Sequence, residues 1–239
     1  LGMVKAIGFA GFKEFRNAVI AETARNEGTT TVHHPMYGFP LEKEDRLEDV
    51  PRKIVTTTAK VLEDNLKNIS IKTYKKIIEI LKNARMIDIY SVENSNVAAR
   101  DLLTKLLYLG LNCRHMDDDY HQRICAGNLT EEDAAIGISY SGCSRDTVEA
   151  IKAAKKSKAT TIVITNFRDS IISRYADYLI CTSQEQLFYG DAIFSRTSQL
   201  VLVDMIYMGL LLSDYDRYSK RLDASSKLIR NKAYMDEEF

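Results

Sequence analysis

The feature that most constrains the fold is a rhythm that begins near residue 86, where short apolar runs alternate with amphipathic helical segments. Each run has the length of one buried strand, and the segments between the runs place apolar residues at helical spacing. The runs are MIDIYS (86–91), CRHM (113–116), AAIGIS (134–139), TTIVIT (160–165) and YLICT (178–182). This alternation predicts an α/β fold: a five-stranded parallel sheet with helices on both faces and right-handed crossovers.

Helices are expected between these strands and on either side of the sheet. The predicted helices between the strands cover residues 95–109, 120–126, 144–157 and 170–175. Two helices are predicted before the sheet, over 47–67 and 71–83, and two after it, over 191–212 and 214–233. The 191–212 segment is too apolar to present a wide face to solvent, so part of it is expected to pack on a second subunit, in a homodimer or a dimer of dimers.

The composition excludes several classes of protein. Of the 239 residues, 45% are apolar and 28% charged, which is ordinary for a soluble globular chain, and the formal net charge of zero gives no bulk attraction to a polyanion. No apolar run approaches the ~20 residues of a membrane span, and no signal peptide is recognisable, so we expect a cytoplasmic protein without a membrane partner. The four cysteines lack metal-ligand spacing, and neither a metal nor a cofactor is expected.

Two strand–helix junctions carry the chemistry. The second junction, ISYSGCSRDT (138–147), gathers three serines around one glycine. Gly142 permits a tight or left-handed turn, and Ser144 is placed to cap the following helix. A phosphate here would meet the free amides of the first helical turn and the hydroxyls of Ser139, Ser141 and Ser144. Turns and helix caps favour the same residue types without any ligand, so this junction alone leaves both interpretations open.

The first junction, YSVENSNVAARD (90–101), places Asn94, Ser95 and Asn96 where a strand ends and a helix begins. Simple helix capping again accounts for these residues. Ligands of open parallel sheets bind outside the carboxyl ends of the strands, so two such junctions would form one site if their strands are neighbours.

The sequence of both junctions resembles the sugar isomerase (SIS) domain, a phosphosugar-binding α/β fold of flavodoxin-like, three-layer type. The resemblance extends from about Lys67 to Arg221, and ISYSG…VEAIKAAK…ITN carries most of it. Two loops clasp the phosphate in that family, a G-x-G-x-S loop and an S-x-S-G-x-[ST] loop. The first loop departs from the family pattern, because Ser91 and Glu93 stand where the family has glycine. The resemblance implies a phosphosugar site that comprises Asn94, Ser95, Asn96, Ser139, Tyr140, Ser141, Gly142 and Ser144, with His121 and Glu185 as further contacts.

Residues outside these loops resemble one subgroup of SIS proteins. IGFAGFKEFRNAVIAE (7–22) is similar to the end of the helix-turn-helix domain of RpiR-type transcriptional regulators, and FYGDAIFSRTSQLVLVDMIYMGLL (188–211) to a helix of the same family. The expected organisation is a remnant of a truncated DNA-binding domain (1–27), a linker (28–47) and a SIS domain (48–239). The implied function is a sugar-phosphate sensor of carbohydrate metabolism that modulates binding to operator DNA through the full-length N-terminal domain.

A phosphosugar aldose–ketose isomerase is the alternative function. Such an enzyme needs a general base, for which the candidates are Glu93, His121 and Glu185. The resemblance to a regulator favours a sensor without catalytic residues, in which His121 and Glu185 contact ligand. Arg196, at the start of the long apolar segment, is expected to pair with an acidic neighbour. Cys143, beside Gly142, is interpreted as an ordinary small side chain, although its place at a helix start permits reactivity.

Overall fold

The structure, a computed structural model, describes residues 44–182 and 196–232. Contacts within the chain divide it into two units, residues 1–53 and 54–239. The predicted DNA-binding remnant (1–27), most of the predicted linker (28–47) and Glu185 lie outside the described residues. Among the residues that are described, no helix combines the length and apolar character that a bilayer span requires.

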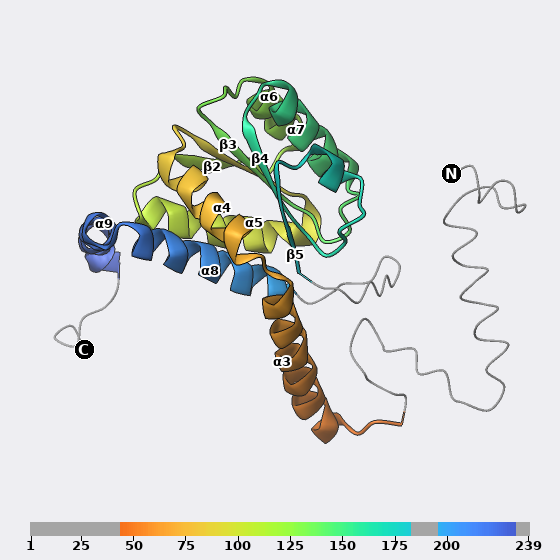
Figure 1. Cartoon of the computed structure of the whole chain (residues 1–239). Coiled ribbons are helices and arrows are strands. Elements are labelled where there is room, and N and C mark those ends of the chain that lie inside the picture. The colour runs from red at the N-terminus through yellow and green to blue at the C-terminus, as the bar shows by residue number, and fades with distance from the viewer. Residues whose placement is uncertain (1–43, 183–195, 233–239) are drawn as a thin grey trace, which may run out of the picture. The chain divides into compact units, whose positions relative to one another are not determined.

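A parallel five-stranded sheet forms the centre of the second unit (Figure 1). All four strand pairings are parallel, as the alternating pattern predicts. The fold prediction is therefore confirmed, and every strand begins and ends within one residue of the predicted run. The strands are β1 (Ile87–Tyr90), β2 (Cys113–His115), β3 (Ala134–Ile138), β4 (Thr160–Thr165) and β5 (Tyr178–Cys181).

The strand order β2-β1-β3-β4-β5 fixes where a ligand can bind. In sheets of this flavodoxin-like order, the connections leave β1 and β3 towards opposite faces, which opens a crevice at the carboxyl ends of these two strands. Tyr90 of β1 lies in register with Gly137 of β3, so the two strands end side by side. The junctions that the sequence singles out are those that follow β1 and β3.

Helices cover both faces of the sheet (Figure 1). Helices α4, α5 and α8 pack together on one face, and α6 and α7 on the other. The predicted helix over 170–175 is a short 3₁₀ turn, η4 (Ile172–Tyr175). The α-helices are α3 (Val50–Asn68), α4 (Ile71–Asn83), α5 (Asn96–Tyr108), α6 (Asp119–Gly127), α7 (Arg145–Lys156), α8 (Thr197–Ser213) and α9 (Tyr215–Ile229), and the other 3₁₀ turns are η2 (Leu47–Asp49), η3 (Glu93–Ser95) and η5 (Arg230–Lys232).

Successive strand residues feed two separate cores, because side chains alternate across a strand. In β4, Ile162 and Ile164 join the core under α4, α5 and α8, whereas Val163 joins the core under α6 and α7. All three side chains are fully buried. Burial on both faces explains why the strands read as continuous apolar runs.

Helix α4 illustrates how the local sequence determines where a helix begins and which of its faces is buried. Ser70 precedes the helix and its hydroxyl accepts the backbone N–H of Thr73, which caps the first turn. Ile77, Ile78 and Leu81 follow at helical spacing and are buried against the sheet. Burying such side chains stabilises the fold by roughly 1.5–3 kcal/mol each.

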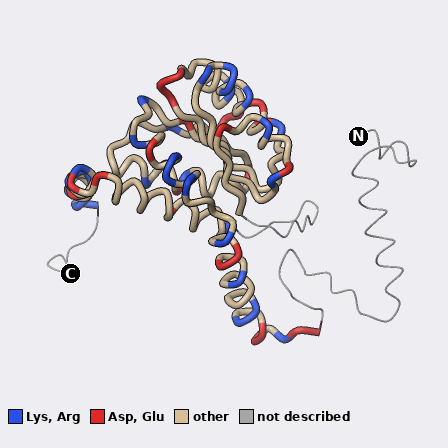
Figure 2. Tube along the Cα trace, in the orientation of Figure 1, with Lys and Arg blue, Asp and Glu red and all other residues tan. Residues whose placement is uncertain are grey.

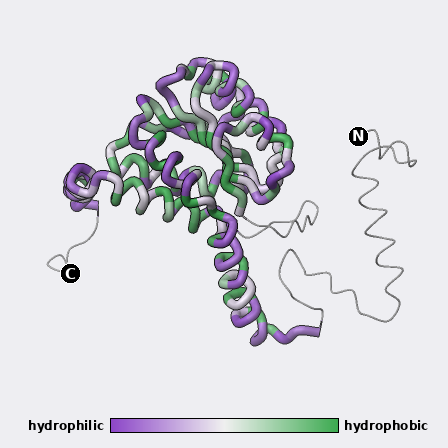
Figure 3. Tube along the Cα trace, in the orientation of Figure 1, coloured by the Kyte–Doolittle hydropathy of each residue, from purple (hydrophilic) through white to green (hydrophobic). Residues whose placement is uncertain are grey.

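Helices α3 and α8 expose apolar side chains. Apolar residues recur at helical spacing along α3, but Asn65 is its only buried residue, and Leu66 is 62% exposed. Helix α8 is apolar along most of its length, in contrast to the more hydrophilic α9 (Figure 3). It buries Leu202, Val203, Ile206 and Leu210, yet Met208 and Leu212 remain 47% and 72% exposed.

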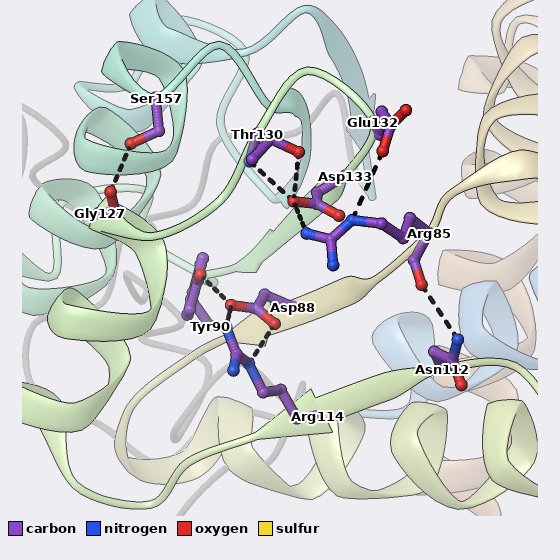
Figure 4. A network of polar contacts seen from close by, with 10 residues as sticks. All are labelled: Arg85, Asp88, Tyr90, Asn112, Arg114, Gly127, Thr130, Glu132, Asp133 and Ser157. Atoms are coloured by element: carbon purple, nitrogen blue, oxygen red, sulfur yellow. Dashed lines mark hydrogen bonds and ion pairs between the residues drawn. The ribbon is translucent and has the colours of Figure 1, made fainter.

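Most charged residues lie on helices and loops, and few lie on the strands (Figure 2). One exception is the ion pair between Asp88, which is fully buried, and Arg114, whose side chain is 34% exposed (Figure 4). Asp88 of β1 lies opposite Arg114 of β2, whose Nε donates to Asp88 Oδ1 at 2.6 Å. The hydroxyl of Tyr90 donates to Asp88 Oδ2, also at 2.6 Å. Burial, together with the neighbouring Asp88, raises the pKa of Tyr90, so its hydroxyl stays protonated and can donate.

Candidate functional site

The loops that follow β1 and β3 meet at one edge of the sheet, because the two strands are parallel neighbours. The condition under which the two predicted junctions form one site is therefore met. The β1 loop contains Ser91 and η3 and leads into α5. The β3 loop, residues 139–144, leads into α7 on the opposite face.

The β3 loop is a tight turn held by its own serines. Gly142 has φ +63°, in the left-handed region that favours glycine. Its N–H is shared between Ser139 Oγ at 3.1 Å and the Ser139 carbonyl at 3.3 Å. The N–H of Cys143 donates to Ser141 Oγ at 3.2 Å. Ser141 Oγ accepts its bond, so its O–H group can donate to an acceptor, whereas the Ser139 hydroxyl already donates to Ser144 Oγ at 3.5 Å.

Ser144 occupies the N-cap position of α7, as predicted, but its hydroxyl makes no capping hydrogen bond. Ser139 Oγ instead lies 3.5 Å from Ser144 Oγ. The first-turn amides of α7 therefore keep the partial positive charge of an uncapped helix start. Cys143, beside these residues, is exposed.

The β1 loop is fixed by a residue that sequence reasoning missed. Gln122 of α6 is 1% exposed, and its amide accepts the N–H of Ser91 at 3.2 Å and donates to the Ser91 carbonyl at 2.8 Å. A third bond, also 2.8 Å, reaches the carbonyl of Met116. The Ser91 hydroxyl donates to Asn96 Oδ1 at 2.6 Å, so the predicted contact residue Asn96 holds the loop.

Glu93 adopts φ +55°, a left-handed conformation at a position where the SIS pattern has glycine. Its side chain is exposed and folds back on the chain, where Oε2 accepts the N–H of Asn94 at 2.5 Å. Asn94 is half-buried. Ser95 is 6% exposed and occupies the N-cap position of α5 without a capping bond from its side chain. Asn94 and Ser95 thus lie close to the carboxyl end of β1, and neither side chain caps α5.

Tyr140 links the β3 loop to β4 and to the start of α8. Its carbonyl accepts the N–H of Asn166 at 3.0 Å and the Thr165 hydroxyl at 3.2 Å. Its ring packs edge-on against Phe167, with 6.1 Å between centroids. The guanidinium carbon of Arg196 lies 5.1 Å from the same ring, within the range of a cation–π contact. Burial raises the pKa of Tyr140.

Among the described residues, no acidic side chain forms an ion pair with Arg196, so the expected pairing stays a prediction. Its Nε and Nη1 are buried and have no hydrogen-bond partner in the part of the chain that the structure describes. Burial lowers the pKa of Arg196, whereas the charges of Glu93 and Tyr140 raise it. Glu93 is thus an electrostatic neighbour of Arg196 and not a bonded partner.

His121 lies at the start of α6, with a side chain that is 67% exposed. Its Nδ1 is 3.7 Å from Asp118 Oδ1, and its backbone N–H donates to the same carboxylate at 2.9 Å. Burial raises the pKa of Asp119, and so do the carboxylates of Asp146, in the first turn of α7, and Asp118. The starts of α6 and α7 are therefore electrostatic neighbours. His121 stays a predicted ligand contact.

Comparisons with known proteins identify the family. Residues 80–209 match the SIS domain. An HTH-type transcriptional regulator of Haemophilus influenzae is 30% identical over 89% of this chain and 73% of its own length. Another, from Caldanaerobacter subterraneus subsp. tengcongensis, is 30% identical over 94% of this chain and 78% of its own length.

Solved structures agree on the fold. The Vibrio vulnificus NanR protein, solved in complex with ManNAc-6P, superposes with a TM-score of 0.78 at 20% identity, over 97% of this chain and 80% of NanR. The sugar isomerase domain of an RpiR transcription factor from Sphaerobacter thermophilus gives 0.69 at 20% identity, over 75% of this chain and 99% of that domain. With the family match, the sequence relatives and the fold in agreement, the chain belongs to the RpiR-type transcriptional regulators that carry a SIS domain.

Proposed function

We propose that this chain is the effector-sensing part of a sugar-responsive transcriptional regulator and binds a phosphosugar between the loops that follow β1 and β3. The observation that carries the proposal is the meeting of two serine-bearing loops at the switch point of the sheet, where β1 and β3 end side by side. NanR, whose fold is similar, was solved with a phosphosugar, which supports the same class of ligand for this chain.

The phosphate would bind at the start of α7. There it would accept hydrogen bonds from first-turn amides and from the hydroxyls of Ser139, Ser141 and Ser144. Ser95 would contribute from the opposite loop. Tyr140, Gly142, Asn94 and Asn96 would shape the site without a charge of their own.

Sensing is favoured over isomerisation because no described candidate base is held ready for proton transfer. Glu93 is exposed, and its carboxylate is bonded to the neighbouring backbone. His121 has a side chain that is 67% exposed, and its ring lies near Asp118. A catalytic base requires a fixed position within hydrogen-bond reach of the substrate carbon-bound proton. Aldose–ketose isomerase activity remains the second candidate, since proteins of similar fold include a putative sugar-phosphate isomerase from Listeria monocytogenes, with a TM-score of 0.62.

The output of such a sensor would be a change in operator binding. Helix-turn-helix dimers read half-sites at fixed spacing, so a ligand that favours one dimer geometry alters affinity without touching the DNA contacts. Ordinary coupling of this kind is about 1–3 kcal/mol. The DNA contacts would come from the N-terminal domain of a cytoplasmic regulator.

The apolar surface of α8 is the proposed dimer contact. Met208 and Leu212 are exposed, and Leu212 borders a groove of about 480 Å³ that Tyr74, Ile78 and Gly209 also line. A second copy of α8 would bury these side chains. Sedimentation velocity should give a dimer for the wild type and a monomer for Leu212→Lys, whereas Leu228→Lys, at an 82% exposed position of α9, should stay dimeric. A monomeric wild type would refute the contact.

A thermal-shift screen of sugar phosphates against the wild type and Ser141→Ala tests the ligand proposal. A true ligand at a hundredfold excess over its Kd stabilises the protein by about 2.7 kcal/mol, and Ser141→Ala should lose most of that shift. Ser157→Ala, at the far end of α7, is the matched control and should keep it. No stabilisation by aldose, ketose or amino-sugar phosphates would contradict the proposal. Incubation of a hit, followed by analysis for its isomer, separates sensor from isomerase.

A further inference from the structure

Arg196, directly before α8, has N–H groups for which the described residues supply no hydrogen-bond acceptor. Both Nε and Nη1 are buried without a hydrogen-bond partner, although its guanidinium carbon lies 5.1 Å from the Tyr140 ring. A guanidinium is charged at any physiological pH and has five N–H donors. A buried cation normally has a counter-charge and hydrogen bonds, and each exception in a native protein calls for an explanation.

The place of Arg196 suggests what would pair with it. Tyr140 belongs to the β3 loop, and Glu93, whose charge acts on the pKa of Arg196, belongs to the β1 loop. Arg196 therefore lies within reach of both loops of the candidate site, although it follows them by more than fifty residues. The Glu93 carboxylate forms no hydrogen bond with Nε or Nη1 of Arg196, and its Oε2 accepts the Asn94 N–H instead.

Gln199 is a second polar side chain with buried atoms that lack hydrogen-bond partners. It lies one helical turn beyond Arg196 on α8 and is 2% exposed. Neither Oε1 nor Nε2 has a hydrogen-bond partner among the described residues. Helix α8 packs against α5, the helix that the β1 loop leads into. The start of α8 thus holds two side chains, Arg196 and Gln199, with buried polar atoms that have no partner among the described residues.

We propose that Arg196 binds the phosphate of the ligand and offsets the charge of Glu93, with Gln199 as a polar partner of the same ligand. The inference rests on the proposed function and deepens it, since it assigns the cation of the site and a preference for dianions. A carboxylate in a phosphate-binding loop repels a dianion, so this site needs a positive charge that a glycine-lined loop does not. Neutral sugars and monoanions would gain less from the same residue.

The test compares Arg196→Met, Arg196→Lys and Arg217→Met in the full chain. Arg217 is the matched control, because its guanidinium carbon lies 5.2 Å from the ring of Tyr218 in α9. The probes are inorganic phosphate, hexose 6-phosphates, hexosamine 6-phosphates and the unphosphorylated sugars. Calorimetric titration gives Kd, and the unfolding midpoint without any probe gives stability.

Arg196→Met should weaken binding of phosphate-bearing probes at least tenfold, with Arg196→Lys in between and Arg217→Met like the wild type. Without a probe, the unfolding midpoint of Arg196→Met should equal or exceed that of the wild type, because a buried unpaired charge is removed. A midpoint well below that of Arg217→Met would identify a structural role for Arg196 and overturn the proposal.

The remaining outcomes separate this inference from the proposed function. If sugar phosphates bind and Ser141→Ala weakens them, but Arg196→Met does not, the assignment of Arg196 is wrong and the proposed function stands. If only inorganic phosphate binds and depends on Arg196, the assignment stands and sugar-phosphate sensing falls. Absence of any phosphate binding to the wild type overturns both.

Discussion

Gly142 lies against Ser170 so closely that a methyl group on the glycine would overlap Ser170 Oγ and Cβ. The same methyl group would lie 2.9 Å from Thr165 Oγ1. The β3 loop is thus pressed onto the segment before η4, and the bond from the Ile172 N–H to the Gly142 carbonyl, 3.0 Å, fixes it there. The turn geometry of the candidate site depends on a residue without a side chain.

Gly142→Ala should therefore destabilise the protein and disrupt the loop. The left-handed φ of +63° costs an alanine roughly 1–2 kcal/mol, and the overlap with Ser170 adds to that. Chemical denaturation measures the loss. Gly127→Ala, at the end of α6 where an added methyl meets nothing within 4 Å, should be neutral or slightly stabilising. Equal effects of the two variants would contradict this account of the loop.

Glu93→Gly should make the protein more stable and increase its affinity for phosphate. Glycine adopts φ +55° without the steric cost that glutamate bears, which predicts a gain of roughly 0.5–1 kcal/mol in the free energy of unfolding. Removal of the carboxylate also removes repulsion from the anion site. Denaturation and phosphate titration measure the two effects.

Lys158→Gly is the matched control for Glu93→Gly. Lys158 has φ +68° just after α7, at the end of that helix far from the candidate site. This variant should gain similar stability without any change in phosphate affinity. If the two variants change phosphate affinity equally, the effect of Glu93 is not electrostatic.

The fold was predictable from sequence because the strands are buried on both faces. The structure places β4 at Thr160–Thr165, as the run TTIVIT predicts, and buries five of its six residues. That the Ser95 and Ser141 loops follow neighbouring strands was only conditional in the sequence. It needed the order β2-β1-β3-β4-β5, which depends on how the strands pair.

The residues that sequence reasoning missed are those whose partners come from distant segments. Gln122 satisfies the backbone of Ser91 across 31 positions, so no local pattern reveals it. Asp88 and Arg114 look out of place in apolar runs until the register of β1 and β2 sets them opposite each other. The described neighbours of Arg196, Tyr140 and Glu93, likewise come from two other loops, so no local pattern reveals them.

Arg114→Met should be strongly destabilising, because it leaves Asp88 as an unpaired carboxylate inside the sheet. Asp88 is fully buried and accepts from both Nε and Nη2 of Arg114 (Figure 4). Loss of one partner of a fully buried pair costs about 3–5 kcal/mol, which is the upper bound here because Arg114 is 34% exposed and Asp88 keeps the bond from the Tyr90 hydroxyl. Arg100→Met, which breaks an exposed pair with Asp117, should cost at most about 1 kcal/mol. Urea denaturation at neutral pH compares them, and similar losses would show that Asp88 is well solvated.

Asp133 should make the protein lose stability in acid. This carboxyl group lies just before β3, and burial raises its pKa, but bonds from the Thr130 N–H and hydroxyl and from Arg85 outweigh that effect, so the pKa is lowered from 3.8 (Figure 4). The folded protein therefore binds the proton less tightly than the unfolded chain. The stabilisation is fully present above the unfolded pKa of 3.8 and is lost as the pH falls through the folded pKa.

The variant Asp133→Asn tests this linkage. The amide keeps the shape of the side chain but sets an N–H₂ group among donors, so stability at pH 7 should fall by roughly 1–3 kcal/mol. Denaturation curves between pH 7 and pH 3 should then show a shallower loss of stability with acid than the wild type. Asp64→Asn, whose carboxylate pairs with Lys67 on the surface of α3, should leave the wild-type pH dependence nearly intact, because solvent screens such pairs. An unchanged acid dependence in Asp133→Asn would assign the proton uptake to other carboxylates.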